Sequence, residues 1–262
     1  MMDEEKLIYS DQFGGIQRLY GHSSLDVLNR SHVVVIGLGG VGSWTAESLV
    51  RSGVGQISLV DLDDICVTNT NRQLHTLSTT IGLTKIEVMK ERLLLINPKV
   101  KIELIHDFVS PHNLEKIIPN CDLIIDAIDS LKSKAALIDY AIKNKIQLIT
   151  TGASGGKQDP SQIRISDFGH TQGDALIFRT RKFLKREYNY PKGKHTFNVD
   201  AIYSAERVKF INESGEIQQK GAQGHAKLDC NSGLGSATFV TGSFGFFASS
   251  MAVKRLLEKN EL

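Results

Sequence analysis

The sequence has few cysteines, and none of them are paired at a metal-binding spacing. Cys66, Cys121 and Cys230 stand far apart among 262 residues, and no C-x-x-C occurs. This spacing excludes a zinc knuckle and a dithiol redox pair, so we expect no zinc. An odd and sparse cysteine count fits a reducing compartment, and we therefore expect a cytoplasmic protein.

An excess of charge of one sign is also lacking. The 31 Lys and Arg residues nearly balance the 29 Asp and Glu residues, which leaves a formal net charge of +2. Nucleic-acid binding would therefore need a local basic patch. Residues 1–12 are charged and contain no apolar run of the signal-peptide kind.

Residues 233–253 carry no charge, and the stretch is long enough to cross a bilayer. The stretch is rich in Gly, Ser and Thr, and its apolar density is modest. A buried strand, or a loop leading into a core-facing helix, is the favoured interpretation. Peripheral or single-pass membrane association through 233–253 is the weaker alternative.

The first half of the chain alternates strand and helix patterns. We expect strands at 32–36, 56–60, 100–106, 123–129 and 146–150, and helices at 42–52, 84–97 and 131–145. This alternation predicts an α/β fold, a Rossmann-like and mostly parallel sheet with helices on both faces. The second half is less regular, with strand patterns at 162–166 and 197–204, and predicts a smaller mixed C-terminal extension of the sheet.

A glycine-rich turn follows the first expected strand. Residues 33–43 read VVVIGLGGVGS, in which Gly37, Gly39 and Gly42 fit the spacing G-x-G-x-x-G. Such a turn holds nucleotide phosphates against the N-terminus of the helix that follows. Asp61 ends the next apolar run, where a carboxylate accepts hydrogen bonds from ribose hydroxyls. The pattern predicts a nucleotide site at the carboxyl ends of the strands.

Further polar residues favour ATP over a nicotinamide cofactor. Arg72 and Lys85 follow the second strand, and Asp129 ends the strand pattern at 123–129. A cationic pair near phosphates neutralises the charge that develops on a leaving pyrophosphate. An aspartate on the same rim can hold Mg²⁺ together with phosphate oxygens. An NAD dehydrogenase needs an acid–base group beside the nicotinamide and has no use for this pair.

Residues 37–98, together with 122–130, resemble the ThiF/MoeB/HesA family, adenylating relatives of the ubiquitin-activating enzymes. The resemblance implies ATP-binding residues at Gly37, Gly39, Gly40, Gly42, Asp61, Asn69, Arg72, Lys85 and Ser130, with Arg72, Lys85 and Asp129 catalytic and Mg²⁺ at Asp129. It also implies a homodimer, and Arg18 is a candidate to reach the partner's site although it lies outside the usual R-x-x-R register. We expect one domain over 1–262, with a nucleotide-binding half at 1–155 and a substrate and dimer half at 156–262.

The later segments resemble one branch of this family. Residues 150–187, 199–206 and 228–249 look like the enzymes that dehydrate threonylcarbamoyladenosine next to the anticodon of tRNA. The resemblance implies that ATP activates the threonyl carboxylate as an adenylate, and that ring closure expels AMP. Cys230 is then interpreted as a small buried thiol, because dehydration needs no thioester.

Two other functions stay open. The first is an adenylyltransferase that activates the C-terminal Gly-Gly of a ubiquitin-like sulfur carrier, and the lack of C-x-x-C pairs argues against it. The second is a non-catalytic ATP-binding scaffold in sulfur transfer, and the intact Arg72, Lys85 and Asp129 argue against that. A cysteine desulfurase or sulfur-acceptor protein is a candidate partner.

The segment 179–194 is the candidate tRNA surface. Its cationic residues include Arg179, Arg181, Lys182, Lys185 and Arg186, and two tyrosines, Tyr188 and Tyr190, interleave with them. Cations contact phosphates and tyrosines stack on unpaired bases, so the composition suits RNA. A solvated basic helix face is the alternative.

Overall fold

Short runs of aliphatic residues form a seven-stranded sheet that is covered on both faces. The computed structural model describes residues 4–193, 195–211, 214, 216–219 and 234–259. The strands follow the order β3-β2-β1-β4-β5-β7-β6. They are β1 (His32–Ile36), β2 (Gln56–Val60), β3 (Lys101–Ile105), β4 (Leu123–Asp126), β5 (Gln147–Thr151), β6 (Ile163–Asp167) and β7 (Asp200–Ser204). Neighbours from β3 to β7 pair in parallel, and β6 pairs antiparallel with β7.

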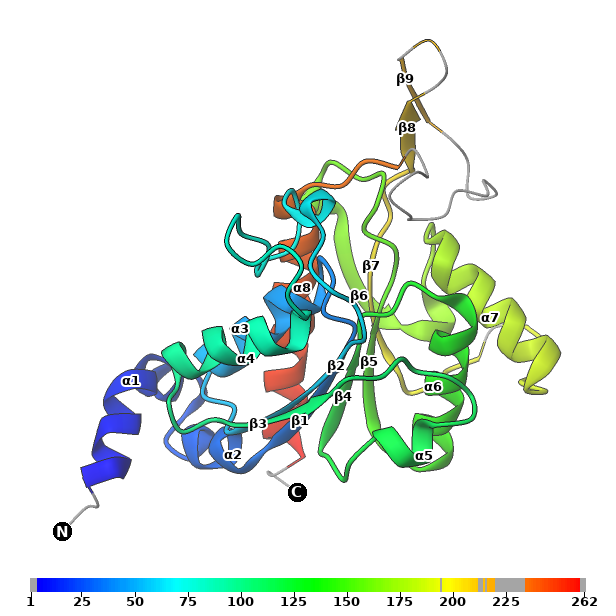
Figure 1. Cartoon of the computed structure of the whole chain (residues 1–262). Coiled ribbons are helices and arrows are strands. Elements are labelled where there is room, and N and C mark those ends of the chain that lie inside the picture. Colours follow the sequence, from blue (N-terminus) through cyan, green and yellow to red (C-terminus); the bar gives the residue numbers. More distant parts are fainter. Residues whose placement is uncertain (1–3, 194, 212–213, 215, 220–233, 260–262) are drawn as a thin grey trace.

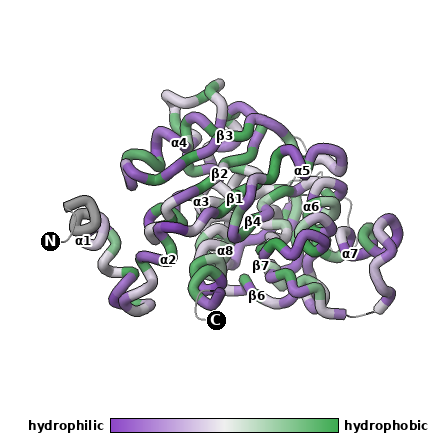
Figure 2. Tube along the Cα trace, turned by 90° about the horizontal axis from the view of Figure 1, so that it is seen from below, coloured by the Kyte–Doolittle hydropathy of each residue, from purple (hydrophilic) through white to green (hydrophobic). Residues whose placement is uncertain are grey.

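Helices flank both faces of this sheet. They are α1 (Glu4–Tyr20), α2 (Ser24–Arg30), α3 (Gly42–Arg51), α4 (Lys85–Ile96), α5 (Leu114–Ile117), α6 (Leu131–Lys143), α7 (Ala175–Glu187) and α8 (Thr238–Glu258). Figures 1 and 2 show α3 and α8 on one side of the strands and α5, α6 and α7 on the other. A separate antiparallel pair, β8 (Lys209–Ile211) and β9 (Ile217–Gln219), projects from the body. The predicted Rossmann-like α/β fold with a mixed extension is confirmed.

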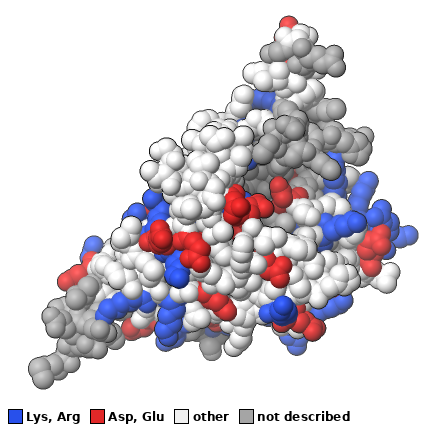
Figure 3. Space-filling view, in the orientation of Figure 1, with Lys and Arg blue, Asp and Glu red and all other residues white. Residues whose placement is uncertain are grey.

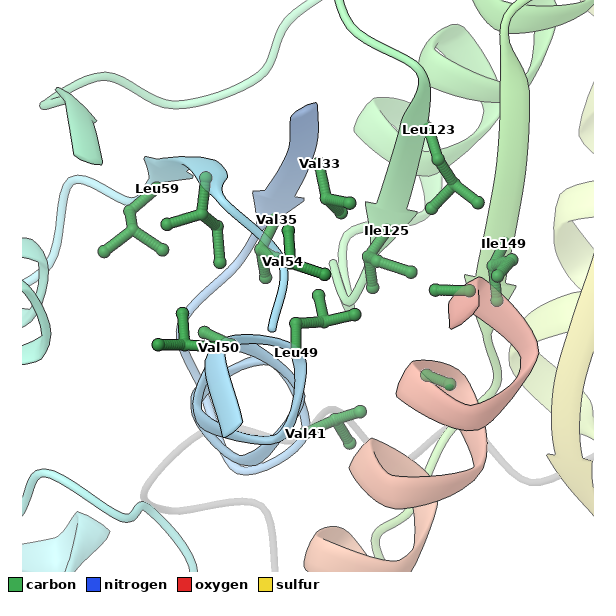
Figure 4. Close-up of a cluster of buried hydrophobic side chains, with 14 of the residues drawn as sticks. Val33, Val35, Val41, Leu49, Val50, Val54, Leu59, Leu123, Ile125 and Ile149 are labelled. Carbon is green, nitrogen blue, oxygen red and sulfur yellow. The ribbon is translucent and has the colours of Figure 1, made fainter. Parts of the chain in front are cut away.

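Alternate residues of the central strands supply two separate cores. Val33 and Val35 of β1 belong to the cluster that packs with α3 and α8, shown in Figure 4. Val34 and Ile36 belong to the other cluster, which packs with α5, α6 and α7. Every residue of β1 is buried, and the four residues after His32 are aliphatic, as is usual for a strand covered on both faces. The sheet therefore offers only its strand ends to a ligand.

The long uncharged stretch folds largely into α8. The buried residues of α8 include Val240, Phe244, Ala248 and Ala252, which join the core cluster beneath the sheet. Burial against α3 and the strands explains the lack of charge, which confirms the interpretation of a core-facing helix. Among the helices that the structure describes, none combines the length and the apolar character needed to cross a membrane.

Strand β4 is shorter than the sequence pattern predicts. The pattern extended the strand to Asp129, whereas β4 ends at Asp126. The Asp126 carboxylate turns inward and accepts hydrogen bonds from Thr150 Oγ1 at 2.6 Å and from the backbone N of Ile128 at 3.1 Å. The second bond bends the chain out of the strand, so Asp129 lies on the loop beyond it.

Candidate active site

The carboxyl ends of β1, β2, β4 and β5 surround a cavity of about 920 Å³. Because parallel strands present these ends at one edge, residues far apart in the sequence meet there. The predicted residues that line the cavity are Gly37, Gly39, Gly40, Asp61, Asn69, Arg72, Lys85, Asp129 and Ser130. Gly42 does not line it, and begins α3 directly behind the glycine turn.

Two glycines of this turn have no room for a side chain. Gly37 has a φ of +87°, and a Cβ on it would lie 3.0 Å from the carbonyl oxygen of Ala127. A Cβ on Gly42 would lie 1.8 Å from the carbonyl oxygen of Gly37. The turn therefore packs tightly against the end of β4 and directs the N-terminus of α3 at the cavity. Such a helix end favours phosphate, because its first backbone N–H groups have no partner within the helix.

Asp61 links the glycine turn to Lys85. Its Oδ2 accepts a hydrogen bond from the backbone N of Leu38 at 2.6 Å, and its Oδ1 lies 3.6 Å from Lys85 Nζ. Lys85 Nζ also forms an ion pair with Asp63 Oδ2 at 2.6 Å. The Lys85 side chain is 6% exposed, whereas that of Asp63 is 73% exposed. The buried Lys85 ammonium is thus held beside the glycine turn, and an anionic ligand can displace its exposed partner Asp63. The sequence analysis missed Asp63, whose only signal is its place in the acidic run after β2.

Arg72 packs on the glycine turn and has no carboxylate partner among the described residues. Its Nη1 donates to the carbonyl oxygen of Thr68 at 2.8 Å and to Asn71 Oδ1 at 3.1 Å. A Cβ on Gly40 would lie 3.3 Å from Arg72 Cγ, so the stem of the side chain runs along the turn. Asn69 accepts a hydrogen bond from the backbone N of Cys66 at 3.0 Å, which fixes the turn before Arg72. The guanidinium charge is therefore free to meet an anion in the cavity.

Asp129 and Ser130 are exposed to the cavity, and no described hydrogen bond or ion pair engages the Asp129 carboxylate. The loop that carries them rests on a charge cluster that the sequence analysis missed. Lys134 Nζ lies 2.7 Å from Asp126 Oδ2, and both side chains are 0% exposed. Lys134 also donates to Thr150 Oγ1 at 3.1 Å. Nothing in the sequence distinguishes Lys134 from the surface lysines, because its burial depends on the neighbouring strand β5.

The basic residues predicted for tRNA divide into two groups on α7. Lys182 and Arg186 are exposed, and Lys185 donates to the carbonyl oxygen of Gly193 at 2.8 Å. Arg181 is half-buried, and its guanidinium donates to the carbonyl oxygens of Phe168 and Thr171 at 2.7 and 3.2 Å. Figure 3 shows Lys and Arg side chains gathered over α7, with acidic side chains nearer the middle of the face. The exposed cations of α7 thus lie beside the acidic side chains of this face, and Arg181 faces inward.

Two other predicted residues, Tyr190 and Arg18, lie away from the cavity. Tyr190 packs on the Phe197 ring and donates to Asp139 Oδ1 at 3.2 Å. Arg18 is exposed in the last turn of α1, which extends outward in Figure 1, and it is not part of the cavity wall. Cys230 lies outside the described residues. The described wall of the cavity is therefore formed without Arg18.

A buried histidine, His75, gives the stability of the fold a pH dependence. His75 is 1% exposed and neither ring nitrogen has a described partner. Burial, reinforced by the charges of Lys85 and Arg92, lowers the pKa of His75 to about 4. The unfolded chain therefore takes up a proton near pH 6.5 while the folded protein does not, and stability falls as the pH drops from 6.5 towards 4.

We expect His75→Gln to weaken this acid sensitivity. Between pH 7 and pH 5 the histidine should cost the native state roughly 2 kcal/mol, a loss that glutamine does not share. Denaturant unfolding of both proteins at the two pH values measures it. An equal acid-induced loss in the native protein and in His75→Gln would show that His75 is not the cause.

The comparisons with known proteins agree with this geometry. A profile described as the ThiF family matches residues 9–261. The tRNA threonylcarbamoyladenosine dehydratase of Haemophilus influenzae is 46% identical over 253 residues, 96% of this chain and 95% of that protein. Its Escherichia coli counterpart is 44% identical over 255 residues, 96% and 95% of the two chains.

A solved structure extends the likeness to three dimensions. The crystal structure of the E. coli tRNA N6-threonylcarbamoyladenosine dehydratase in complex with ATP superposes with a TM-score of 0.86 at 40% identity, covering 100% of this chain and 98% of that one. Fold, sequence and cavity residues lead to the same assignment. The chain belongs to the ThiF family, and within it to the branch of the tRNA threonylcarbamoyladenosine dehydratases.

Proposed function

We propose that this protein uses ATP to dehydrate N6-threonylcarbamoyladenosine next to the anticodon of tRNA. The observation that carries the proposal is the cavity that joins the glycine turn, Arg72, Lys85 and Asp129 at one edge of the sheet. The names of relatives that are 44% and 46% identical over nearly the whole chain supply the acceptor. Such an acceptor goes with a cytoplasmic protein.

The reaction proceeds in two steps that balance. A carboxylate oxygen of the threonyl group attacks the α-phosphorus of ATP, and pyrophosphate leaves. An atom of the carbamoyl group then attacks the activated carbonyl carbon, the ring closes, and AMP leaves with the former carboxylate oxygen. The nucleoside thus loses one water without releasing it, because the oxygen departs on AMP and the protons go to solvent.

The nucleotide half of the cavity stabilises the first step. Backbone N–H groups at the start of α3 would bind the phosphates, and Asp61 lies at the end of β2, where a ribose would sit. Arg72 and Lys85 supply positive charge where negative charge grows on the phosphates. Lys85 would exchange its exposed partner Asp63 for a phosphate oxygen, since Asp63 is solvated and easily released.

Asp129 is our proposed magnesium ligand, with Ser130 beside it. Mg²⁺ in nucleotide sites is usually held by one or two carboxylates together with phosphate oxygens and water. A single exposed carboxylate with no described partner fits that mode. When bound, the ion would neutralise charge on the phosphates.

The test of this function is mass spectrometry of the nucleosides of modified tRNA. Threonylcarbamoylated tRNA is incubated with the protein and Mg-ATP, and digested. The proposal expects a modified adenosine that is lighter by one water, with AMP formed in equal amount. No mass change, together with pyrophosphate exchange that needs a ubiquitin-like carrier protein, would favour the carrier adenylyltransferase. ATP binding without either activity would favour a scaffold.

The exposed cations of α7 form our proposed tRNA surface. We expect Lys182→Glu with Arg186→Glu to weaken tRNA binding several-fold and to flatten its salt dependence, because each phosphate contact releases counterions. Filter binding at two salt concentrations measures both effects. Arg51→Glu, on the exposed end of α3, is a control charge reversal away from α7. Unchanged tRNA affinity in the α7 variant would exclude this surface.

We also propose a homodimer in which residues 1–155 serve the nucleotide and residues 156–262 serve the acceptor and the partner. Phe239 and Phe246 of α8 are 60% and 51% exposed, which suits a covered face. In such a dimer Arg18 would reach the partner's cavity. A sulfur-transfer protein is a further candidate partner. The solution mass, as one chain or two, tests the dimer.

A further inference from the structure

The cavity has a second half that the nucleotide residues do not occupy. The glycine turn, Asp61 and Lys85 lie around β1 and β2, whereas 151–155 and Leu176 line the cavity beside β5 and α7. The strand order changes direction between β1 and β4, which is where ligands of open α/β sheets bind. The loop after β5 is therefore the wall of the half of the cavity that the nucleotide residues leave free.

One buried carboxylate ties this loop to α7. Asp174 Oδ2 accepts a hydrogen bond from the backbone N of Ala153 at 3.1 Å and lies 3.2 Å from Lys157 Nζ. Asp174 Oδ1 accepts from the backbone N of Ile177 at 3.0 Å and so caps the start of α7. The side chains of Lys157 and Asp174 are 1% and 0% exposed. The Asp174 carboxylate thus joins the loop after β5 to the start of α7.

The surroundings of this pair leave the loop little freedom. Lys157 Nζ also donates to the carbonyl oxygen of Ser204 at 3.2 Å and lies 5.7 Å from the centre of the Phe244 ring. A Cβ on Gly152 would lie 2.3 Å from Asp174 Oδ2. Apolar residues of similar size often give as much stability as a buried ion pair. The Asp174 carboxylate instead fixes the position of the loop relative to α7, because it contacts the loop, the helix and Lys157 at once.

The same helix joins the cavity to the basic surface. Leu176 lines the cavity, and Lys182 and Arg186 are exposed further along α7. At about 1.5 Å per residue, Leu176 and Arg186 are roughly 15 Å apart along the axis. A shift of Asp174 would therefore change the position of the cavity wall relative to the exposed cations Lys182 and Arg186.

We propose that Asp174 and Lys157 are positioning residues for the acceptor. They hold the loop at 152–155 as the wall of a subsite for an amino-acid group attached to an RNA nucleoside, and they set that wall against α7. Neither side chain lines the cavity, so each acts through the loop. The inference rests on the proposed function, because it assigns the second half of the cavity to that function's acceptor.

Two variants test the inference by different routes. Lys157→Met removes the charge and keeps the stem on Phe244, whereas Gly152→Ala keeps both charged side chains and forces the loop away from Asp174. Arg255→Met is the matched control, because it removes a pair with Asp200, 2.6 Å apart, away from the cavity wall. Thermal unfolding first selects the variants that are folded. The affinity for ATP alone, and kcat and KM with modified tRNA, are then measured.

We expect both variants to keep their ATP affinity within about twofold while kcat/KM for tRNA falls roughly tenfold to a hundredfold, as for small misplacements of a reactant. Arg255→Met should match the native protein in both readouts. An equal loss of ATP affinity, or an unchanged kcat/KM in folded variants, would overturn the positioning role alone. If the native protein itself fails to dehydrate modified tRNA while it binds ATP, the proposed function fails and the acceptor role fails with it.

Discussion

Replacing Arg72 by alanine should lower the turnover of modified tRNA by roughly a hundredfold or more, which is about 3 kcal/mol of transition-state stabilisation. Arg72 is the cation of the glycine turn that no described carboxylate neutralises. Its charge is thus available to the phosphates as pyrophosphate leaves. Single-turnover formation of AMP measures the effect directly.

Arg72→Lys and Arg51→Ala make this prediction specific. Lysine keeps the charge but lacks the planar fork, so we expect only partial recovery of the rate. Arg51 is the exposed partner of Glu47 on α3, and its removal should leave turnover unchanged. Full-rate turnover by Arg72→Ala would contradict the assignment of the phosphate site.

The largest loss of stability is expected from Lys134→Met. This change leaves the fully buried Asp126 carboxylate without its cation, and breaking one side of a buried pair typically costs about 3–5 kcal/mol. Because Asp126 also holds the backbone of Ile128, the folded fraction should bind Mg-ATP more weakly through a displaced Asp129. Denaturant unfolding measures the free energy, and titration with Mg-ATP measures the second effect.

A second substitution, at Asp126, separates the effect of the unpaired charge from the effect of packing. Asp126→Asn together with Lys134→Met removes the orphaned charge, so we expect the double variant to recover part of the lost stability. Lys143→Met, which removes the exposed partner of Asp139 on the same helix, should change stability by less than about 1 kcal/mol. A Lys134→Met protein as stable as Lys143→Met would refute the role given to the buried pair.

Local patterns predicted the sheet and its nucleotide edge well. The alternation of apolar runs with amphipathic segments carries enough information to place β1 to β5 within a few residues. Strands β1, β2, β4 and β5 are buried on both faces, and β3 alternates polar with apolar residues. The spacing of Gly37 and Gly42 likewise predicts their turn, since only glycine fits both places. The site residues meet at one cavity because parallel strands place their carboxyl ends at the same edge of the sheet.

Residues whose role depends on distant contacts could not be predicted. Asp126 and Asp129 look alike in the sequence, and only the burial of Lys134, eight positions away on α6, distinguishes the inward acid from the exposed one. Arg181 and Lys182 are neighbours in one basic run. The orientation of α7 in the fold directs Arg181 inward, where it donates to the carbonyl oxygen of Phe168, and leaves Lys182 exposed. The pair of Lys157 and Asp174 spans 17 positions and two elements, which no local pattern reveals.

The central claim is that a carboxylate of the acceptor attacks the α-phosphorus of ATP in this cavity. The most direct test is one turnover with modified tRNA whose threonyl carboxylate carries a heavy oxygen isotope, followed by mass spectrometry of the nucleotide products. Our account predicts that the heavy oxygen appears in the phosphate of AMP, together with a nucleoside that is lighter by one water. Label in inorganic phosphate with release of ADP, or label in bulk water with unlabelled AMP, would contradict it.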